Sequence, residues 1–295
     1  MSDKVDIAVK RLKEAAEMSQ AMYEQPLVIT YSGGKDSDTI LKLAQIAKIP
    51  FEVLHNHTSA DAPETVYHIR NKFRELELSG IKCDIDYHFR LDGTRTTMWN
   101  LIPKKMMPPT RIVRYCCAEL KEGGGKGRFI ATGVRWAESN ARKCRGSLEV
   151  IVPDKRRSLF LSNDNDEDRR LFESCKMKGK RVVNPIIDWT TEDVLDFCKA
   201  ENVNLCPLYA EGWHRVGCIG CPMAGKKRYM EFARYPTYKK AYIAAFDRMI
   251  EERKRRDMMK GFTRIGDTGV DVFHWWMEDG ILPGQTVLPG FEEDA

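Results

Sequence analysis

Short apolar runs alternate with helical patterns over the first half of the chain. Residues 27–31 (LVITY) form an apolar and β-branched run that ends directly at a Ser-Gly-Gly turn. Apolar residues then recur at helical spacing at Ile40, Leu41, Leu43, Ala44 and Ala47. The pattern predicts a strand, a loop and a helix in that order over residues 27–47.

The same alternation continues beyond this unit. Further strands are predicted at residues 51–55, 84–88 and 129–133, and a helix is predicted to begin near Pro63 and Glu64. Alternating strands and helices argue for an α/β fold with a parallel sheet covered on both faces. In such folds, ligands bind at the carboxyl ends of the strands.

The alternation of strands and helices becomes less regular in the second half of the chain, and this change suggests how the chain is divided. The polar residues 162–168 (SNDNDED) are predicted to be an exposed loop or linker, so a boundary is expected near residue 160. Thr190 with the acidic residues after it predicts a helix start, and residues 236 to about 260 predict a long helix. The expected division is an N-terminal helix (1–24), a nucleotide-binding core (25–160), a smaller, mostly helical and cysteine-rich region (161–283) and an irregular tail (284–295).

Composition and charge narrow the class of protein. The 295 residues, 42% hydrophobic and 31% charged, have the composition of an ordinary globular protein. No apolar stretch reaches the roughly 20 residues that span a bilayer, and the charged N-terminus is unlike a secretory signal, so we expect a cytoplasmic protein with no membrane partner. The net charge of +5 is mild. Basic runs at residues 226–228 and 253–256 could hold a polyanion, although a solvated helix face is the more common role of such runs.

The turn after the first strand has the features of a phosphate site. Gly33 and Gly34 would let the backbone approach a phosphate, and the following helix would present free N–H groups to the anion. Ser32, Ser37 and Lys35 would add hydroxyl donors and a cation. The Walker pattern is absent.

The hexapeptide at residues 32–37 (SGGKDS) resembles the PP-loop of ATP pyrophosphatases, which cleave ATP between its α and β phosphates and leave an adenylated substrate and pyrophosphate. Four further segments resemble the phosphoadenylylsulfate (PAPS) reductase branch of that class. They are residues 58–65 (TSADAPET), 114–121 (RYCCAELK), 133–142 (GVRWAESNAR) and 185–189 (PIIDW). The resemblance runs from about Leu27 to Met223 and implies a Rossmann-like PP-loop domain of the adenine nucleotide alpha hydrolase-like type.

This resemblance implies that the protein binds ATP or a related adenine nucleotide with Mg²⁺. Asp36 is expected near the phosphate-bound magnesium, although its side chain could equally cap the helix. Gly133 and Arg135 are expected at the nucleotide, since a guanidinium fork binds phosphate or sulfate oxygens bidentately. Arg142 is expected to act in the same way, with Lys121 as a further positive charge, while a surface ion pair is the common alternative for any single arginine. The expected catalytic residues are therefore Lys35, Asp36, Lys121, Arg135 and Arg142.

Nine cysteines in a cytoplasmic chain are best interpreted as thiols, some of them metal ligands. The pair Cys116 and Cys117 together with Cys218 and Cys221 resembles adenylylsulfate (APS) reductases, in which four such cysteines hold a 4Fe-4S cluster. One of Cys116 or Cys117 with Cys206, Cys218 and Cys221 instead resembles the ATP pyrophosphatase of DNA phosphorothioation systems, which is also an iron-sulfur protein. Two cysteine pairs can also bind Zn²⁺, which is the alternative metal.

Three functions fit these patterns. The first is an ATP pyrophosphatase that adenylates a substrate and supports sulfur transfer, with a sulfur-donor protein such as a cysteine desulfurase as partner. The basic C-terminal region is compatible with a nucleic-acid substrate. The second is a divergent APS or PAPS reductase. Because those enzymes attack their nucleotide with a cysteine near the C-terminus, the lack of any cysteine after Cys221 argues against it. The third is a nucleotide-binding partner subunit without turnover.

Overall fold

The computed structural model describes residues 2–125, 127–152, 155–262 and 264–278, and these residues form two compact units. The first unit contains Met1–His57, Ala62–Asp86 and Gly123–Gly217. The second contains Thr58–Asp61, Tyr87–Glu122 and Cys218–Ala295. Each unit is therefore assembled from segments that are far apart in the sequence. The boundary expected near residue 160 falls inside the first unit, within its sheet.

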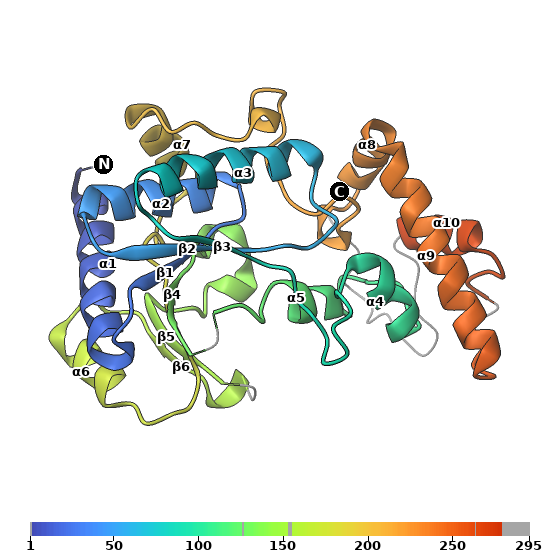
Figure 1. Ribbon diagram of the computed structural model, residues 1–295, viewed down its shortest axis with the longest axis horizontal. Helices are drawn as coiled ribbons and strands as arrows, with labels where there is room; N and C mark the ends of the chain where they lie inside the picture. Colours follow the sequence, from blue (N-terminus) through green and yellow to red (C-terminus); the bar gives the residue numbers. More distant parts are fainter. Residues whose placement is uncertain (1, 126, 153–154, 263, 279–295) are drawn as a thin grey trace. The chain divides into compact units, whose positions relative to one another are not determined.

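A seven-stranded sheet organises the first unit (Figure 1). Its strands are β1 (Leu27–Thr30), β2 (Phe51–Asn56), β3 (Cys83–Asp86), β4 (Phe129–Ala131), β5 (Leu148–Ile151), β6 (Leu159–Leu161) and β7 (Lys180–Val183). Their order is β3-β2-β1-β4-β7-β5-β6. Strand β5 runs antiparallel to both of its neighbours, and the other adjacent strands are parallel. The predicted α/β fold is confirmed, with a sheet that is mostly rather than wholly parallel.

The four strands predicted from the sequence are all present, within two residues of the expected ends. Strands β5, β6 and β7 were not predicted. They are three or four residues long, and β5 and β7 contain charged residues. Glu149 in β5, for example, is fully buried and paired with Arg145. Such a paired charge interrupts the apolar run by which a buried strand is recognised.

The helices of the first unit are α1 (Ser2–Tyr23), α2 (Lys35–Ala47), α3 (Pro63–Leu78), α6 (Asp166–Ser174) and α7 (Thr191–Ala200), with 3-10 turns η1 (Trp136–Glu138), η2 (Asn140–Arg142), η3 (Lys155–Arg157) and η4 (Pro207–Tyr209). Thr190 and Asp193 form the capping box that the sequence predicted for α7. The prediction of a loop throughout residues 162–168 was wrong. The side chain of Asn165 caps α6, and the acidic residues that follow stabilise its first turn.

Helices α1, α2 and α7 pack against one face of the sheet and form the main core. Leu27 and Ile29 of β1 point into that core, whereas Val28 points to the other face with Ile130 and Val182. This alternation follows from the two-residue repeat of a strand. Helix α3 packs against Tyr31 and β2 in a second cluster.

The order of the strands defines where a ligand can bind. From β1 the chain moves to β2 and β3 on one side and then returns to β4 on the other side of β1. In open α/β sheets, the crevice for ligands lies at the carboxyl ends of the strands, where the direction of winding changes. Residues 32–37 follow β1 and residues 133–135 follow β4, so both segments lie at this switch point.

The second unit is helical, with α4 (Met98–Lys105), α5 (Tyr115–Leu120), α8 (Lys227–Arg234), α9 (Pro236–Arg255), α10 (Gly269–Met277) and the 3-10 turn η5 (Pro222–Ala224). Helices α4 and α10 pack against α9 around the aromatic rings of Tyr242 and Trp276. Helix α9 ends at Arg255, somewhat before the predicted residue 260. The predicted tail at residues 284–295 lies outside the described residues. No helix among the described residues has the length and apolar character needed to cross a membrane.

Candidate functional site

Gly33, in the loop between β1 and α2, has a backbone conformation that residues with a side chain rarely adopt. Gly33 has a φ of +73°, and a Cβ at this position would lie 2.9 Å from Cγ1 of Ile69. Ser37 donates a hydrogen bond from Oγ to the carbonyl of Gly34 at 2.7 Å, which holds the first turn of α2 closed. Since Lys35 is the first residue of α2, the loop leads directly into the N–H groups at a helix N-terminus.

The loop after β1 is joined to the segment after β4 by a charged pair. Arg135 donates from Nε to Oδ1 of Asp36 at 2.7 Å, and its guanidinium also donates to the carbonyl of Trp189 at 3.3 Å. Nζ of Lys35 lies 3.3 Å from Oδ2 of Asp36. A Cβ on Gly133 would lie 3.1 Å from the backbone of Asp36, so the two segments are in close contact. The structure therefore brings Lys35, Asp36, Gly133 and Arg135 together at the switch point.

Arg142 has a different place from Arg135. Its guanidinium pairs with the carboxylate of Glu138, which also accepts the backbone N–H of Arg135. Arg142 is half-buried, whereas Arg135 is only 2% exposed. The two predicted arginines thus have different environments. Arg135 is buried and pairs with Asp36 of the phosphate loop, whereas Arg142 on η2 forms a local ion pair with Glu138.

A buried polar network next to the phosphate loop was not predicted from the sequence. The hydroxyl of Tyr31 donates to Asp38 Oδ1 at 2.5 Å and lies 3.0 Å from Nε2 of His68. Nε2 of His68 is also 3.3 Å from the Asp38 carboxylate. Burial raises the pKa of Tyr31 well above its usual range, and the nearby charge of Asp38 adds to the effect. Tyr31 and Asp38 directly flank the hexapeptide at residues 32–37, and this position was the sequence feature that could have indicated the network.

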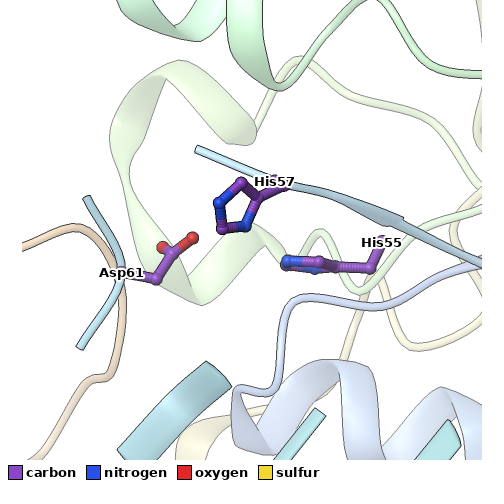
Figure 2. Close-up of side chains that lie close together, drawn as sticks. All are labelled: His55, His57 and Asp61. Atoms are coloured by element: carbon purple, nitrogen blue, oxygen red, sulfur yellow. The ribbon is translucent and has the colours of Figure 1, made fainter. Parts of the chain in front are cut away.

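Two histidines at the carboxyl end of β2 were also missed. His55 and His57 have ring centroids 6.2 Å apart at an angle of 69° (Figure 2). Nδ1 of His55 is 2.9 Å from the carbonyl oxygen of Tyr31, so this ring braces the ends of β1 and β2. Asp61, the third residue labelled in Figure 2, belongs to the second unit, where Thr58 donates a hydrogen bond to it at 2.6 Å.

Four of the candidate metal ligands lie in the second unit. Cys116 and Cys117 are on α5, and Cys218 and Cys221 precede η5. The four thiols are close enough to influence one another. The pKa of Cys116 is raised by its hydrogen bond to Cys117 and by burial, and negative charge on Cys218 and Cys221 raises it further. These are the cysteines of the APS-reductase-like set.

Positive groups accompany these thiols. Arg114 donates from Nη2 to Sγ of Cys117 at 3.3 Å. The pKa of Cys117 is lowered, first by the hydrogen bond from Cys116 and then by Arg114. The pKa of Lys121 is raised, chiefly by the negative charge of Cys218. Lys121, predicted as a catalytic residue, therefore lies with the cysteines of the second unit.

Cys218 also has two oxygen neighbours. Its Sγ lies 3.4 Å from Oγ1 of Thr58 and 3.6 Å from Oδ1 of Asp61. Burial raises the pKa of the Cys218 thiol to about 12, and the ammonium of Lys121 opposes this shift. Segments 58–61 and 218–221 are joined further by the N–H of Ile219, which donates to the carbonyl of Ala60 at 2.7 Å.

Cys206 belongs to the first unit and has other neighbours. It is 1% exposed, and its Sγ lies 3.8 Å from Oγ1 of Thr65 on α3. Burial raises its pKa. Of the remaining cysteines, Cys198 lies in the core beside Thr39.

The fold and the loop define the protein as an α/β nucleotide enzyme of the PP-loop type, with its glycine-rich loop at the switch point of a parallel sheet. Residues 26–224 match the phosphoadenosine phosphosulfate reductase domain, and the chain belongs to that family.

Curated relatives were found at moderate identity. The chain is 25% identical over 258 residues to an uncharacterized 37.8 kDa protein of Escherichia phage 186, covering 78% of this chain and 76% of that protein. It is 30% identical over 195 residues to sulfate adenylyltransferase subunit 2 of Aeromonas hydrophila, covering 64% of this chain and 61% of the relative. The chain thus spans about three fifths of the length of this adenylyltransferase subunit.

Solved structures with a similar arrangement share little sequence with the chain. A phosphoadenylyl-sulfate reductase from Candida auris in complex with phosphate has a TM-score of 0.43 and 16% identity, covering 72% of this chain and 93% of that one. The U34-tRNA thiolase NcsA from Methanococcus maripaludis with its 4Fe-4S cluster has a TM-score of 0.37 and 12% identity, covering 84% and 80%.

Proposed function

We propose that the protein binds ATP with Mg²⁺ at residues 32–37 and cleaves it between the α and β phosphates to adenylate an acceptor. The observation that carries this proposal is the joining of the phosphate loop to the segment after β4 through Asp36 and Arg135. A carboxylate, an ammonium and helix N–H groups therefore lie together at the carboxyl ends of the parallel strands β1 and β4. These are the groups that a nucleotide phosphate with a magnesium ion requires.

Each residue of the loop has a physical role in this proposal. Gly33 and Gly34 allow the backbone to approach the phosphates, and Lys35 and Ser37 supply a cation and a hydroxyl. Magnesium bound by Asp36 would neutralise phosphate charge. In the proposed reaction, an acceptor oxygen attacks the α phosphorus, the bond from that phosphorus to the bridging oxygen breaks, and pyrophosphate leaves with the electron pair. Lys35 and the helix N–H groups stabilise the charge on the departing pyrophosphate.

The cysteines of the second unit are proposed to hold a 4Fe-4S cluster. Four thiolates are the usual ligand set of such a cluster, and Cys116, Cys117, Cys218 and Cys221 supply it within one unit. The positive charges of Arg114 and Lys121 offset the negative charge that four thiolates bring. A bound cluster would supply electron-transfer or sulfide-carrying chemistry. Zn²⁺ is the alternative ion for the same four thiols.

Adenylation and this cluster together support a role in sulfur transfer. Adenylation turns an acceptor oxygen into part of a good leaving group. A sulfur nucleophile, supplied by a donor protein such as a cysteine desulfurase, would then form a bond to the acceptor carbon as AMP departs. A divergent sulfonucleotide reductase is the second candidate, because the cysteines gathered in the second unit are those of the APS-reductase-like set.

The acceptor that the charge distribution favours is a nucleic acid. The sequence segments of the second unit contain 20 Lys and Arg against 16 Asp and Glu, whereas those of the first unit contain 28 against 27. Lys239, Lys240 and Lys254 on α9 are exposed. Exposed basic side chains bind the phosphate backbone of a nucleic acid regardless of its sequence.

The test is incubation of the protein and Mg²⁺ with ATP labelled in the α phosphate, in the presence of candidate nucleic-acid acceptors. We expect AMP and pyrophosphate as products. The rate of their formation should fall about 100-fold in the Lys35→Ala variant. Lys13→Ala, an exposed position on α1, is the matched control and should retain the activity. ATP binding without any AMP would favour the partner subunit without turnover. Sulfite release from APS with a thiol reductant would favour the reductase.

A further inference from the structure

Tyr209 occupies a position on the phosphate loop that the proposed function does not explain. Its hydroxyl oxygen accepts a hydrogen bond from the backbone N–H of Lys35 at 3.0 Å. A Cβ on Gly34 would lie 3.6 Å from this hydroxyl. The phenol oxygen therefore sits directly at the N-terminus of α2.

The segment that carries Tyr209 is held in place by buried neighbours. Cys206 and Leu208 are each 1% exposed, and the Cys206 thiol contacts Thr65 of α3. Thr65 also lines the space beside Gly33, where a Cβ would lie 3.0 Å from its Cγ2. Tyr209 is thus held over the loop by buried neighbours. These contacts also give Cys206 a packing role that needs no metal.

The contact between Tyr209 and Lys35 competes with phosphate binding. A backbone N–H carries a single proton, so the N–H of Lys35 cannot serve the phenol oxygen and a phosphate oxygen fully at the same time. Phosphates bound at the N-terminus of a helix are held by such N–H groups. We propose that the Tyr209 hydroxyl occupies the position of a nucleotide phosphate oxygen at the N–H of Lys35 and is displaced when the nucleotide binds. This inference rests on the proposed function, in that the loop is taken to bind phosphate.

The displaced contact lowers the affinity of the loop for phosphate. A neutral hydrogen bond contributes about 1 kcal/mol, which corresponds to a factor of about 5 in a dissociation constant. Removing only the hydroxyl should therefore make phosphate binding tighter, because the nucleotide no longer has to break this bond. A hydroxyl that instead donates to the bound phosphate would give the opposite sign.

The experiment measures the dissociation constants of inorganic pyrophosphate and of ATP, each with Mg²⁺, for the full chain. The Tyr209→Phe variant is compared with wild type and with Tyr67→Phe, whose side chain on α3 is 64% exposed. We expect Tyr209→Phe to bind both ligands about 5-fold more tightly and Tyr67→Phe to match wild type. Unchanged or weaker binding by Tyr209→Phe would overturn the inference.

A second measurement is independent of the variant. In wild type, hydrogen exchange of the amides in residues 206–217 should become faster when pyrophosphate saturates the loop, since Tyr209 is released. Unchanged or slower exchange at saturation would count against the displacement. The proposed function fails separately, if wild type binds neither ligand or if Lys35→Ala binds both as well as wild type does.

Discussion

Nε of Arg135 lies 2.7 Å from Oδ1 of Asp36, although 99 residues separate them in the chain. The guanidinium is 2% exposed, and the carboxylate belongs to the phosphate loop. A buried guanidinium keeps its charge and donates in a fixed direction, so it holds the partner carboxylate in one orientation. We conclude that Arg135 orients Asp36, the residue proposed to bind magnesium.

Replacing Arg135 by Ala should therefore lower both stability and nucleotide binding. Removal of one partner of a buried ion pair leaves the other without compensation, and we expect a loss of about 3 kcal/mol in the free energy of unfolding. Arg142→Ala is the matched control. Arg142 is half-buried and pairs with Glu138 four residues away, so its loss should be about 0.5 kcal/mol. Urea denaturation measures both values, and equal losses would contradict the assignment.

Arg11 gives a prediction about the fold alone. This arginine of α1 is 6% exposed and donates to Asp164, Asp188 and the carbonyl of Pro185. Arg11→Met should lower the free energy of unfolding by about 3 kcal/mol, because two partly buried carboxylates lose their cation. Lys13→Ala on the exposed side of the same helix should change it by less than about 0.5 kcal/mol. A small loss for Arg11→Met would show that these carboxylates are well solvated.

Metal content should follow the division of the cysteines between the units. We expect about four irons and four acid-labile sulfides per chain in anaerobically purified protein. Single Ser variants of Cys116, Cys117, Cys218 and Cys221 should lose most of the iron. Cys206→Ser should retain it, because the Cys206 thiol is buried and packs against Thr65.

The exposed Cys144 supplies the negative control as Cys144→Ser. Iron lost in Cys206→Ser and kept in one variant of the adjacent pair would favour the phosphorothioation-like ligand set. One zinc per chain and no iron would mean a structural zinc site and would remove the proposed role in sulfur transfer.

Cys83 provides a test of pH dependence away from the candidate sites. Burial raises the pKa of its thiol to about 12, and Glu77 adds to the shift. Because the thiolate is the reactive form, alkylation of Cys83 by iodoacetamide should rise about tenfold per pH unit from pH 8 to about pH 11. In urea-unfolded protein, the rate should level off near the ordinary thiol pKa of about 8.5.

The sign for stability follows from the same shift. Between the unfolded and the folded pKa, the folded state keeps a proton that the unfolded state has lost, so Cys83 makes stability fall as the pH rises through this interval. Mass spectrometry of the Cys83 peptide gives the alkylation rates, with Cys144 as the exposed comparison. A plateau near pH 9 in the folded protein would show that Cys83 is accessible and unshifted.

The basic surface of the second unit can be tested with salt. If nucleic acid binds there, the logarithm of its affinity should fall linearly with the logarithm of the salt concentration. The double variant Lys240→Gln with Lys254→Gln should reduce that slope by about 1 to 2, since each lost phosphate contact lowers it by about 1. Lys199→Gln, exposed on α7 of the first unit, should leave the slope unchanged. An identical slope in the double variant would place the nucleic acid elsewhere.

Much of the fold could be predicted because its signals are local. The run at residues 27–31, the glycine turn and the helical spacing after it identified β1, the loop and α2. Thr190 and Asp193 identified the start of α7 in the same way. Each of these features depends on residues within one or two turns of the chain, where the backbone preferences of glycine and the capping of helix N–H groups act directly.

The sequence by itself determined the α/β class, the hexapeptide as the candidate phosphate site and the cysteines as candidate ligands. Only the tertiary structure decided that Arg135 pairs with Asp36, that Tyr209 accepts a hydrogen bond from the N–H of Lys35, and that Cys206 is in a different unit from the other four candidate metal ligands. The two contacts join residues that are 99 and 174 positions apart. They depend on strand order and side-chain packing, which no local pattern specifies, because a short segment contains no information about which distant segment lies beside it.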